Sequence, residues 1–252
     1  MSPVRWLRAV AVLGATALLL ASSCSWQLGT PIPEGVPPPP GDPVPAIDTY
    51  AKGRPADQLH EWAAERAPKL GIPVAALEAY AYAARVAEVE NPDCKLAWTT
   101  LAGIGQVESH HGTYRGAAIG ANGDVEPPIR GVWLDGTNGN LEIFDDAAVS
   151  HDGDSKHARA MGPMQFIPET WGHYGVDANN DGEVSADNMD DAALSAAGYL
   201  CWTGKDLATP RGWMNALRAY NHSDQYARTV RDWATAYANG HPSRHACRTG
   251  RL

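Results

Sequence analysis

The sequence predicts a mainly α fold, and three observations support this prediction. Apolar residues recur at spacings of three and four along most of the chain after about residue 55, as in helices that pack one face on a core. Residues that favour helix starts precede several of these segments, and no run of alternating apolar and polar residues indicates a sheet. With 252 residues, the chain is long enough for one large domain or two small ones.

Two helices are expected on either side of the turn Gly71-Ile72-Pro73. The first is marked by Leu59, Trp62 and Ala63, and the second by Leu77, Tyr80, Ala81, Ala84 and Ala87. Each set falls on one side of a helix, so both helices are expected to bury an apolar face.

A third helix is predicted between Cys94 and Gly112, because a stripe at helical spacing runs through this stretch and Gly112 is a natural helix stop. The stripe consists of Ala97, Leu101, Ile104 and Glu108. Three of its members are apolar, so an acid ends a face that should point into the core.

Glu108 is therefore the first candidate for a catalytic group. In the last turn of a helix, burial and the negative end of the helix dipole both raise the pKa of a carboxyl group. A carboxylic acid that keeps its proton near neutral pH can act as a general acid. Alternatively, Glu108 is a surface residue, or it pairs with His110 or His111.

Residues 113–160 differ from the rest of the body, because they are rich in Gly and Asp and show little periodicity. A loop of this length inside a compact domain is usually functional. We expect a long irregular insertion here, with a small hairpin around Ile129 to Phe144.

Three later helices have recognisable starts. Asn188 can cap a helix with two aspartates in its first turn, Thr209 precedes a proline at a first helical position, and Ser223 can cap a last helix. The body is therefore expected to be helical up to about residue 240.

The amino terminus is typical of an exported protein. Residues 1–23 combine two arginines with an apolar run of about 13 residues, which is too short to span a bilayer comfortably and suits an export signal. Leu20 to Cys24 is similar to a bacterial lipobox, so we expect a lipid on Cys24 that anchors the protein to the outer face of the plasma membrane. Ordinary signal cleavage and secretion is the alternative.

Residues 24–50 are rich in proline and are expected to form a stiff, extended linker. The folded domain is then expected over residues 51–252. The formal net charge of −9 and the absence of a Lys/Arg cluster argue against nucleic-acid binding, and we expect a monomer.

The four cysteines suggest one disulfide in an oxidising compartment. If Cys24 is lipidated, Cys94, Cys201 and Cys247 remain, and one is left over. Cys94 begins the Glu108 helix, and Cys201 lies on a stripe of small residues that another helix can approach closely. We therefore expect Cys94 to pair with Cys201, and Cys247 to be free or bonded elsewhere.

An acidic loop from Asp177 to Asn188 predicts a structural Ca²⁺ site. Its oxygen-bearing side chains and its central glycine follow the EF-hand loop pattern, except that Asn188 replaces the usual final glutamate. The expected ligands are Asp177, Asn179, Asp181, Glu183 and Asn188. A metal-free turn is the alternative; because no His/Cys cluster has ligand spacing, we expect no metal or other cofactor in catalysis.

Two further segments are expected to form turns and have sequences that could serve a substrate site. Ala160 to Trp171 holds a glycine and two prolines among apolar residues, which disfavours a regular helix and can present Gln165 to a cleft. Tyr220 to Ser223 joins two helices. Either segment alone is as easily explained by structure as by function.

Taken together, the motifs resemble those of the lytic murein transglycosylases of the membrane-bound B type, actinobacterial branch. The similar stretches are GIGQVESHHG (103–112), MGPMQFIPETW (161–171), DDAALSAAGYLC (190–201) and AYNHS (219–223). The resemblance implies a lysozyme-like domain that cleaves the β-1,4 bond between N-acetylmuramic acid and N-acetylglucosamine in peptidoglycan. It places Glu108 as the single catalytic acid and implies substrate contacts from Ser109, Met164, Gln165, Phe166, Tyr220 and Asn221.

Such a reaction forms a 1,6-anhydro-muramoyl end without water. A hydrolytic muramidase, by contrast, needs a second carboxylate, for which Asp145, Asp146, Asp152 and Asp154 are candidates. A cell-wall-binding lipoprotein without turnover is the third possibility.

Overall fold

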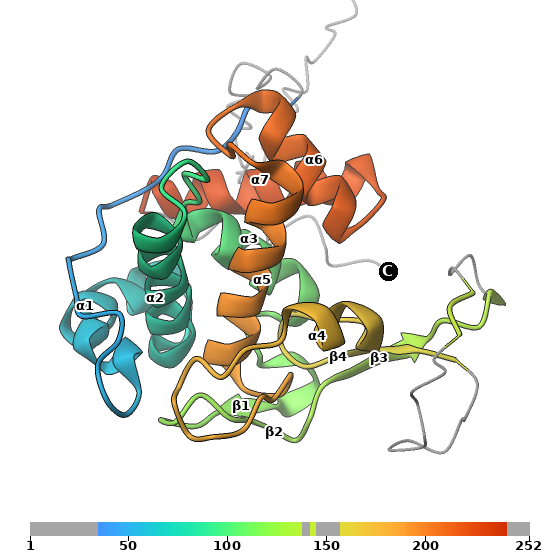
Figure 1. Ribbon diagram of the computed structural model, residues 1–252, viewed down its shortest axis with the longest axis horizontal. Helices are drawn as coiled ribbons and strands as arrows, with labels where there is room; N and C mark the ends of the chain where they lie inside the picture. Colours follow the sequence, from blue (N-terminus) through green and yellow to red (C-terminus); the bar gives the residue numbers. More distant parts are fainter. Residues whose placement is uncertain (1–34, 138–141, 145–156, 241–252) are drawn as a thin grey trace, which may run out of the picture. The chain divides into compact units, whose positions relative to one another are not determined.

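Helices dominate the computed structural model, which confirms the mainly α fold class (Figure 1). The structure describes residues 35–137, 142–144 and 157–240. Outside this part lie residues 1–23, Cys24, Cys247 and the four loop aspartates Asp145, Asp146, Asp152 and Asp154. In chain order the elements are η1 (Pro55–Leu59), α1 (His60–Leu70), α2 (Val74–Glu90), α3 (Trp98–Ser109), η2 (Tyr114–Gly116), β1 (Ala118–Ile119), β2 (Val125–Glu126), β3 (Arg130–Trp133), β4 (Arg159–Met161), α4 (Pro168–Tyr174), α5 (Met189–Gly204), α6 (Pro210–Tyr220) and α7 (Asp224–Ala238).

Helix α5 runs through the middle of the domain, between α2 and α6 (Figure 1). Both α2 and α5 are rich in buried alanine, and small side chains let helix axes approach closely. Leu77 on α2 and Leu200 on α5 are fully buried. A second contact, between α3 and α7, brings the acid-bearing helix against the last one. Among the described helices, none is long and apolar enough to cross a membrane.

Helix α3 is shorter than predicted at both ends. It begins at Trp98, because Cys94 lies in a turn and Lys95 has a left-handed backbone (φ 52°) that interrupts a helix. It ends at Ser109 rather than at Gly112, since His110 takes the left-handed cap conformation (φ 51°). The prediction that Cys94 begins this helix was therefore wrong, whereas Glu108 does lie in its last turn.

The predicted caps of the three later helices are confirmed. The Asn188 side chain accepts hydrogen bonds from the first backbone N–H groups of α5. Thr209 accepts one from α6, and Ser223 accepts one from α7. Each bond satisfies an N–H group that has no partner within its own helix.

The first strand of the hairpin expected at Ile129 to Phe144 pairs mainly with a segment outside that hairpin. Strand β3 pairs antiparallel with β4, with Arg130 opposite Met161 and Trp133 opposite Arg159. In the described part of the predicted hairpin, a single bridge joins Asp135 to Glu142. The strand of residues 130–133 thus pairs across nearly 30 residues of chain, which periodicity within one segment does not reveal.

The predicted disulfide between Cys94 and Cys201 is confirmed. It joins the turn before α3 to the last turns of α5, and both cysteines are buried. The two residues are 107 apart in sequence, and closing a loop of that length gives an idealised stabilisation of about 4–5 kcal/mol.

Residues 35–50, which we expected to belong to a stiff, extended linker, pack on the helical domain as a strap. The indole N–H groups of Trp62 and Trp98 donate to the carbonyls of Pro43 (3.1 Å) and Asp42 (3.0 Å). The Thr99 hydroxyl donates to the carbonyl of Pro39 (3.1 Å). The compact unit accordingly includes these residues, so its boundary lies before residue 35 rather than at residue 51.

Candidate active site

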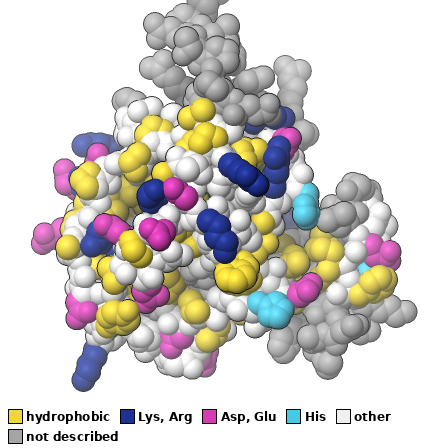
Figure 2. Space-filling view, turned by 45° about the horizontal axis from the view of Figure 1, so that its top comes forward, with side chains coloured by type: hydrophobic (Ala, Val, Ile, Leu, Met, Phe, Trp, Pro, Cys, Tyr) yellow, Lys and Arg dark blue, Asp and Glu magenta, His cyan; other side chains and the backbone are white. Residues whose placement is uncertain are grey.

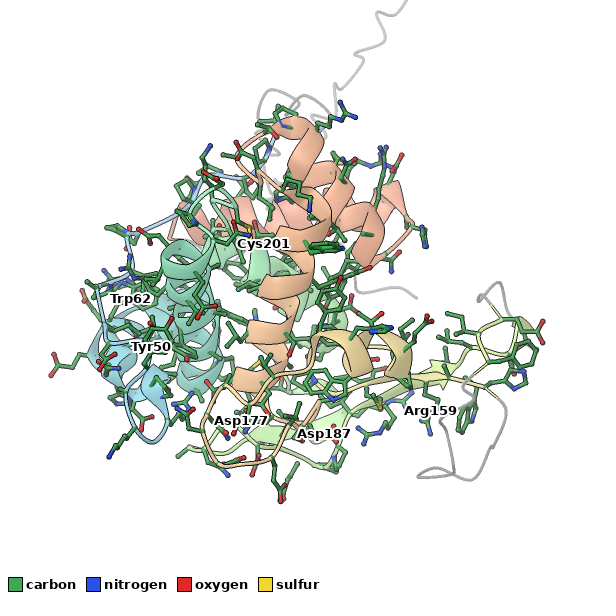
Figure 3. All side chains as sticks on the ribbon, viewed as in Figure 1. Tyr50, Trp62, Arg159, Asp177, Asp187 and Cys201 are labelled. Carbon is green, nitrogen blue, oxygen red and sulfur yellow. A yellow bond between two sulfur atoms is a disulfide. The ribbon has the colours of Figure 1, made fainter. Side chains whose placement is uncertain are left out.

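A cleft of about 870 Å³ opens at the carboxyl end of α3, between this helix and the arm made by β3 and β4. Among its lining residues are three that we expected at a substrate site, namely Glu108, Ser109 and Gln165. Arg159, labelled in Figure 3, lies on the arm and lines the same cleft. The cleft therefore lies between the helix that carries Glu108 and the segment for which the sequence predicted a long irregular loop.

The Glu108 carboxyl is half-buried and has one strong hydrogen bond. The hydroxyl of Tyr226, on α7, donates to Glu108 Oε1 at 2.6 Å. Burial raises the pKa of Glu108 to about 7, and the bond from Tyr226 opposes that rise because it stabilises the anion. Near neutral pH, Glu108 can therefore both give up and take back a proton.

The sequence did not identify Tyr226 as a site residue, because its spacing with Val230, Trp233 and Tyr237 predicts that it lies on the apolar face of the last helix. That assignment is correct for its ring, which is buried, while its hydroxyl reaches the acid. The close contact between α3 and α7 makes this possible. A Cβ at Gly103 would lie 2.7 Å from the Val230 carbonyl oxygen, so a larger residue would push α7 and Tyr226 away.

The turn from Met161 to Phe166 presents Gln165 to the cleft. Its two ends exchange backbone hydrogen bonds, and both Gly162 (φ 70°) and Gln165 (φ 51°) have left-handed backbones. A Cβ at Gly162 would overlap the Ala186 carbonyl, so glycine is required there. The Gln165 side chain donates to the Gly162 carbonyl at 2.8 Å, which fixes its direction.

Ser109 and Tyr220 hold this turn in place through their hydroxyl groups. Ser109 Oγ donates to the Pro163 carbonyl at 2.6 Å, and Tyr220 Oη donates to the Met164 carbonyl at 2.7 Å. The two hydroxyls that we expected to contact substrate are therefore engaged with the backbone of the turn, and they position Gln165.

Three other predicted contact residues lie away from the cleft surface. Met164 and Phe166 are buried in the core, where Phe166 packs edge-on against Trp171 and Tyr220. Asn221 is exposed and accepts a hydrogen bond from the Ser223 N–H. Met164 and Phe166 thus support the turn from behind, because their apolar side chains fill the space under it.

The possible pairing of Glu108 with His111 is excluded by the contacts of that histidine. His111 is buried, and its two ring nitrogens lie 3.2 Å from Tyr80 Oη and 2.9 Å from Tyr237 Oη. Burial lowers the pKa of His111 to about 3, so the ring is neutral and stabilises the end of α3 as a hydrogen-bonding group.

A second carboxylate that the sequence did not reveal, Asp135, also lines the cleft. Its Oδ1 accepts hydrogen bonds from the Thr137 hydroxyl (2.6 Å) and backbone N–H (3.0 Å). These bonds lower the pKa of Asp135, so it is ionised. Among the described residues, the cleft therefore offers one acid with a raised pKa and one anion.

The last residue of the acidic loop from Asp177 to Asn188 has a different role from the predicted one in this structure. Asn188 is buried and caps α5, because its Oδ1 accepts the N–H groups of Asp190 and Asp191. Its side-chain oxygen is thus engaged, which disfavours the expected role of Asn188 as the last ligand. Asp191 enters the loop instead, where its two oxygens accept the N–H groups of Ala178 (2.7 Å) and Ser185 (2.9 Å).

Two observations in this loop fit a bound cation. Asp177 Oδ1 is buried and has no hydrogen-bond partner among the described residues, which is costly for a carboxylate oxygen. Burial raises the pKa of Asp191 to about 6, with further contributions from the negative charges of Asp177 and Asp181. A divalent cation would relieve both costs. In the described residues, however, no three His, Cys, Asp or Glu side chains are gathered closely enough to hold a metal as they stand.

Comparison with known proteins also points to a transglycosylase, and it does so from a part of the chain that does not include Glu108. Residues 140–206 match the family model described as "Transglycosylase SLT domain", which is about a quarter of the sequence. No curated protein and no solved structure matches. The matched part begins after Glu108 and ends before Tyr220, so it covers the turn and the acidic loop. This match supports a lytic transglycosylase family whose substrate is peptidoglycan.

Proposed function

We propose that this protein is a lytic murein transglycosylase of the membrane-bound B type, in which Glu108 is the single acid and base. The observation that carries the proposal is the Glu108 carboxyl, which lies in the cleft with a pKa of about 7 and a hydrogen bond from Tyr226. A general acid works best when its pKa is near the working pH.

The contact with Tyr226 supports one position for the acidic proton in this proposal. Because Tyr226 donates to Oε1, the acidic proton belongs on Oε2, the oxygen that faces substrate in this proposal. Glu108 protonates the glycosidic oxygen, and the C1–O bond of the muramic-acid residue breaks. The resulting carboxylate is stabilised by Tyr226, and it then takes the proton of the 6-hydroxyl as that oxygen bonds to C1. The products are a free 4-hydroxyl and a 1,6-anhydro ring, with Glu108 protonated again.

The second candidate is a hydrolytic muramidase that uses Asp135 as its second carboxylate. Asp135 lines the same cleft and is ionised, which is the state that a nucleophile or base requires. One of its oxygens is already occupied by two hydrogen bonds from Thr137, which disfavours this role.

Mass spectrometry of digested peptidoglycan tests the choice. Transglycosylase products are lighter by one water than the products of hydrolysis and cannot be reduced by borohydride. Reducible ends, together with loss of activity in Asp135→Asn equal to that in Glu108→Gln, would assign the muramidase instead.

We further propose a structural Ca²⁺ in the acidic loop and a lipid on Cys24. Asp177, Asn179, Asp181 and Asp191 supply hard oxygen atoms, which Ca²⁺ prefers, and Glu183 can contribute its backbone carbonyl at the seventh position of the loop. The Ca²⁺ would stabilise the loop against α5 and take no part in the chemistry. A lipid anchor would keep the enzyme at the cell envelope; labelling of the wild type with a fatty acid, and loss of the label in Cys24→Ala, tests it.

A further inference from the structure

An exposed tryptophan marks a second pocket, beside the Cys94–Cys201 disulfide. Trp202 lies in the last turn of α5 with 65% of its surface exposed, which is unusual for so large an apolar side chain. The pocket has a volume of about 550 Å³ and, among the described residues, shares no lining residue with the catalytic cleft. Cys201, labelled in Figure 3, places it along α5.

The backbone around Trp202 is held rigidly. Lys205 has φ 65° and ψ −84°, a conformation that residues with a side chain rarely adopt and that tends to occur at functional sites. Its N–H donates to the Cys201 carbonyl, and Cys201 is fixed by the disulfide. The Lys205 ammonium lies 4.2 Å from the centre of the Trp202 ring, so a cation covers one face of the indole.

The polar groups around the ring are mixed in charge. Lys95 forms an ion pair with Asp206 at 2.7 Å, and Asn91 and Asp93 complete the lining. With Lys205, the described residues that line the pocket include two cations and two anions, so their formal charges sum to zero. Figure 2 likewise shows Lys and Arg side chains interspersed with Asp, Glu and hydrophobic ones on the face that it draws. A polyanion would require an excess of cations.

This combination suits a saccharide. The apolar face of a pyranose ring packs on an indole ring, while its hydroxyl and acetamido groups hydrogen-bond to carboxylates, amides and ammonium groups at the edge. A rigid aromatic platform also loses little conformational entropy when it binds.

We propose that the Trp202 pocket is a second glycan-binding site, which holds a peptidoglycan strand outside the catalytic cleft. The choice of polymer rests on the proposed function. An insoluble polymer offers many equivalent sugars, so a second weak contact raises the effective concentration of strands near Glu108.

The test measures binding in the Glu108→Gln background, so that strands stay intact. We expect cosedimentation with purified peptidoglycan to weaken about threefold to tenfold on adding Trp202→Ala, the effect of losing one aromatic contact. Trp202→Phe should recover part of the binding. Tyr50→Ala removes another exposed aromatic side chain, 73% exposed and lining neither pocket, and should leave binding unchanged.

A second measurement separates this inference from the proposed function. With Glu108 intact, Trp202→Ala should cleave short soluble fragments at the wild-type rate and digest whole peptidoglycan more slowly. Unchanged binding and unchanged digestion in Trp202→Ala would overturn the second site while leaving the transglycosylase proposal intact. Absence of any cleavage by the wild type would refute the proposed function, and the binding comparison would still report on Trp202.

Discussion

Replacing Glu108 with glutamine is expected to remove activity and, at high pH, to stabilise the fold. The amide keeps the size of the side chain and can still accept the hydrogen bond of Tyr226, but it cannot donate a proton as an acid. General acid catalysis typically contributes about 10²–10⁴-fold, so turnover on peptidoglycan should fall by at least that factor.

The gain in stability follows from the pKa of Glu108. The folded protein binds this proton more tightly than the unfolded chain does. The contribution of Glu108 to the free energy of unfolding therefore falls as the pH rises from 4.5 to about 7, and it is constant above that range. Moving a pKa from 4.5 to about 7 costs about 3 kcal/mol once the group is ionised. Because the cleft is open to solvent on one side, we expect about 2–3 kcal/mol.

Urea unfolding of the wild type and Glu108→Gln at pH 4 and pH 8.5 checks this value. The two proteins should be equally stable at pH 4, and the variant should be more stable at pH 8.5. Other groups with raised pKa values, such as Asp190 and Asp191, titrate in both proteins and cancel in the difference. A difference that does not change with pH would refute the reasoning about burial, and more than about a tenth of wild-type activity in the variant would exclude the catalytic role.

Four further outcomes are expected. Tyr226→Phe should raise the pKa of Glu108 above its wild-type value, because a bond to the anion is lost; an unshifted basic limb of the pH–rate profile would contradict this. Asp135→Asn should keep activity within about tenfold, below the usual effect of losing a catalytic base; a loss like that of Glu108→Gln would favour hydrolysis. Ca²⁺ should raise the melting temperature of the wild type and not that of Asp177→Ala, as calorimetry would show. Cys201→Ser should lower the free energy of unfolding by up to about 4–5 kcal/mol; an unchanged denaturation midpoint would mean that the bridge contributes nothing.

The helices and their caps could be predicted because the signals are local. Apolar spacing locates α2 and α3, and Asn188, Thr209 and Ser223 each bond within three residues of themselves. Glu108 became a candidate by the same logic, as a charged residue on an otherwise apolar stripe, and it does line the cleft.

What the sequence did not reveal depends on contacts between distant segments. Tyr226 meets Glu108 across 118 residues, and nothing in the spacing of α7 distinguishes its hydroxyl from that of a core tyrosine. Asp191 was assigned to the first turn of a helix, where an acid is common, and its second role depends on the fold of the loop before it. The β3–β4 pairing is non-local in the same way.

The packing of residues 35–50 on the domain was not predicted, because a proline-rich composition is typical of extended linkers. Proline removes backbone donors and leaves carbonyl acceptors exposed. The indoles of Trp62 and Trp98 use two such acceptors, at Pro43 and Asp42. Tryptophan indole N–H groups, for which the sequence indicates no partner, were the signal that could have suggested packing of the proline-rich segment on the domain.

If Cys24 carries a lipid, the strap also limits how far the folded domain can lie from the membrane. A free chain from Cys24 to residue 50 would span at most about 90 Å, whereas the stretch from Cys24 to residue 35 spans at most about 40 Å. A lipid on Cys24 would therefore confine the cleft to glycan strands in the layer of wall nearest the bilayer. Strands farther out would be cut only after the wall moved toward the enzyme or the anchor was lost.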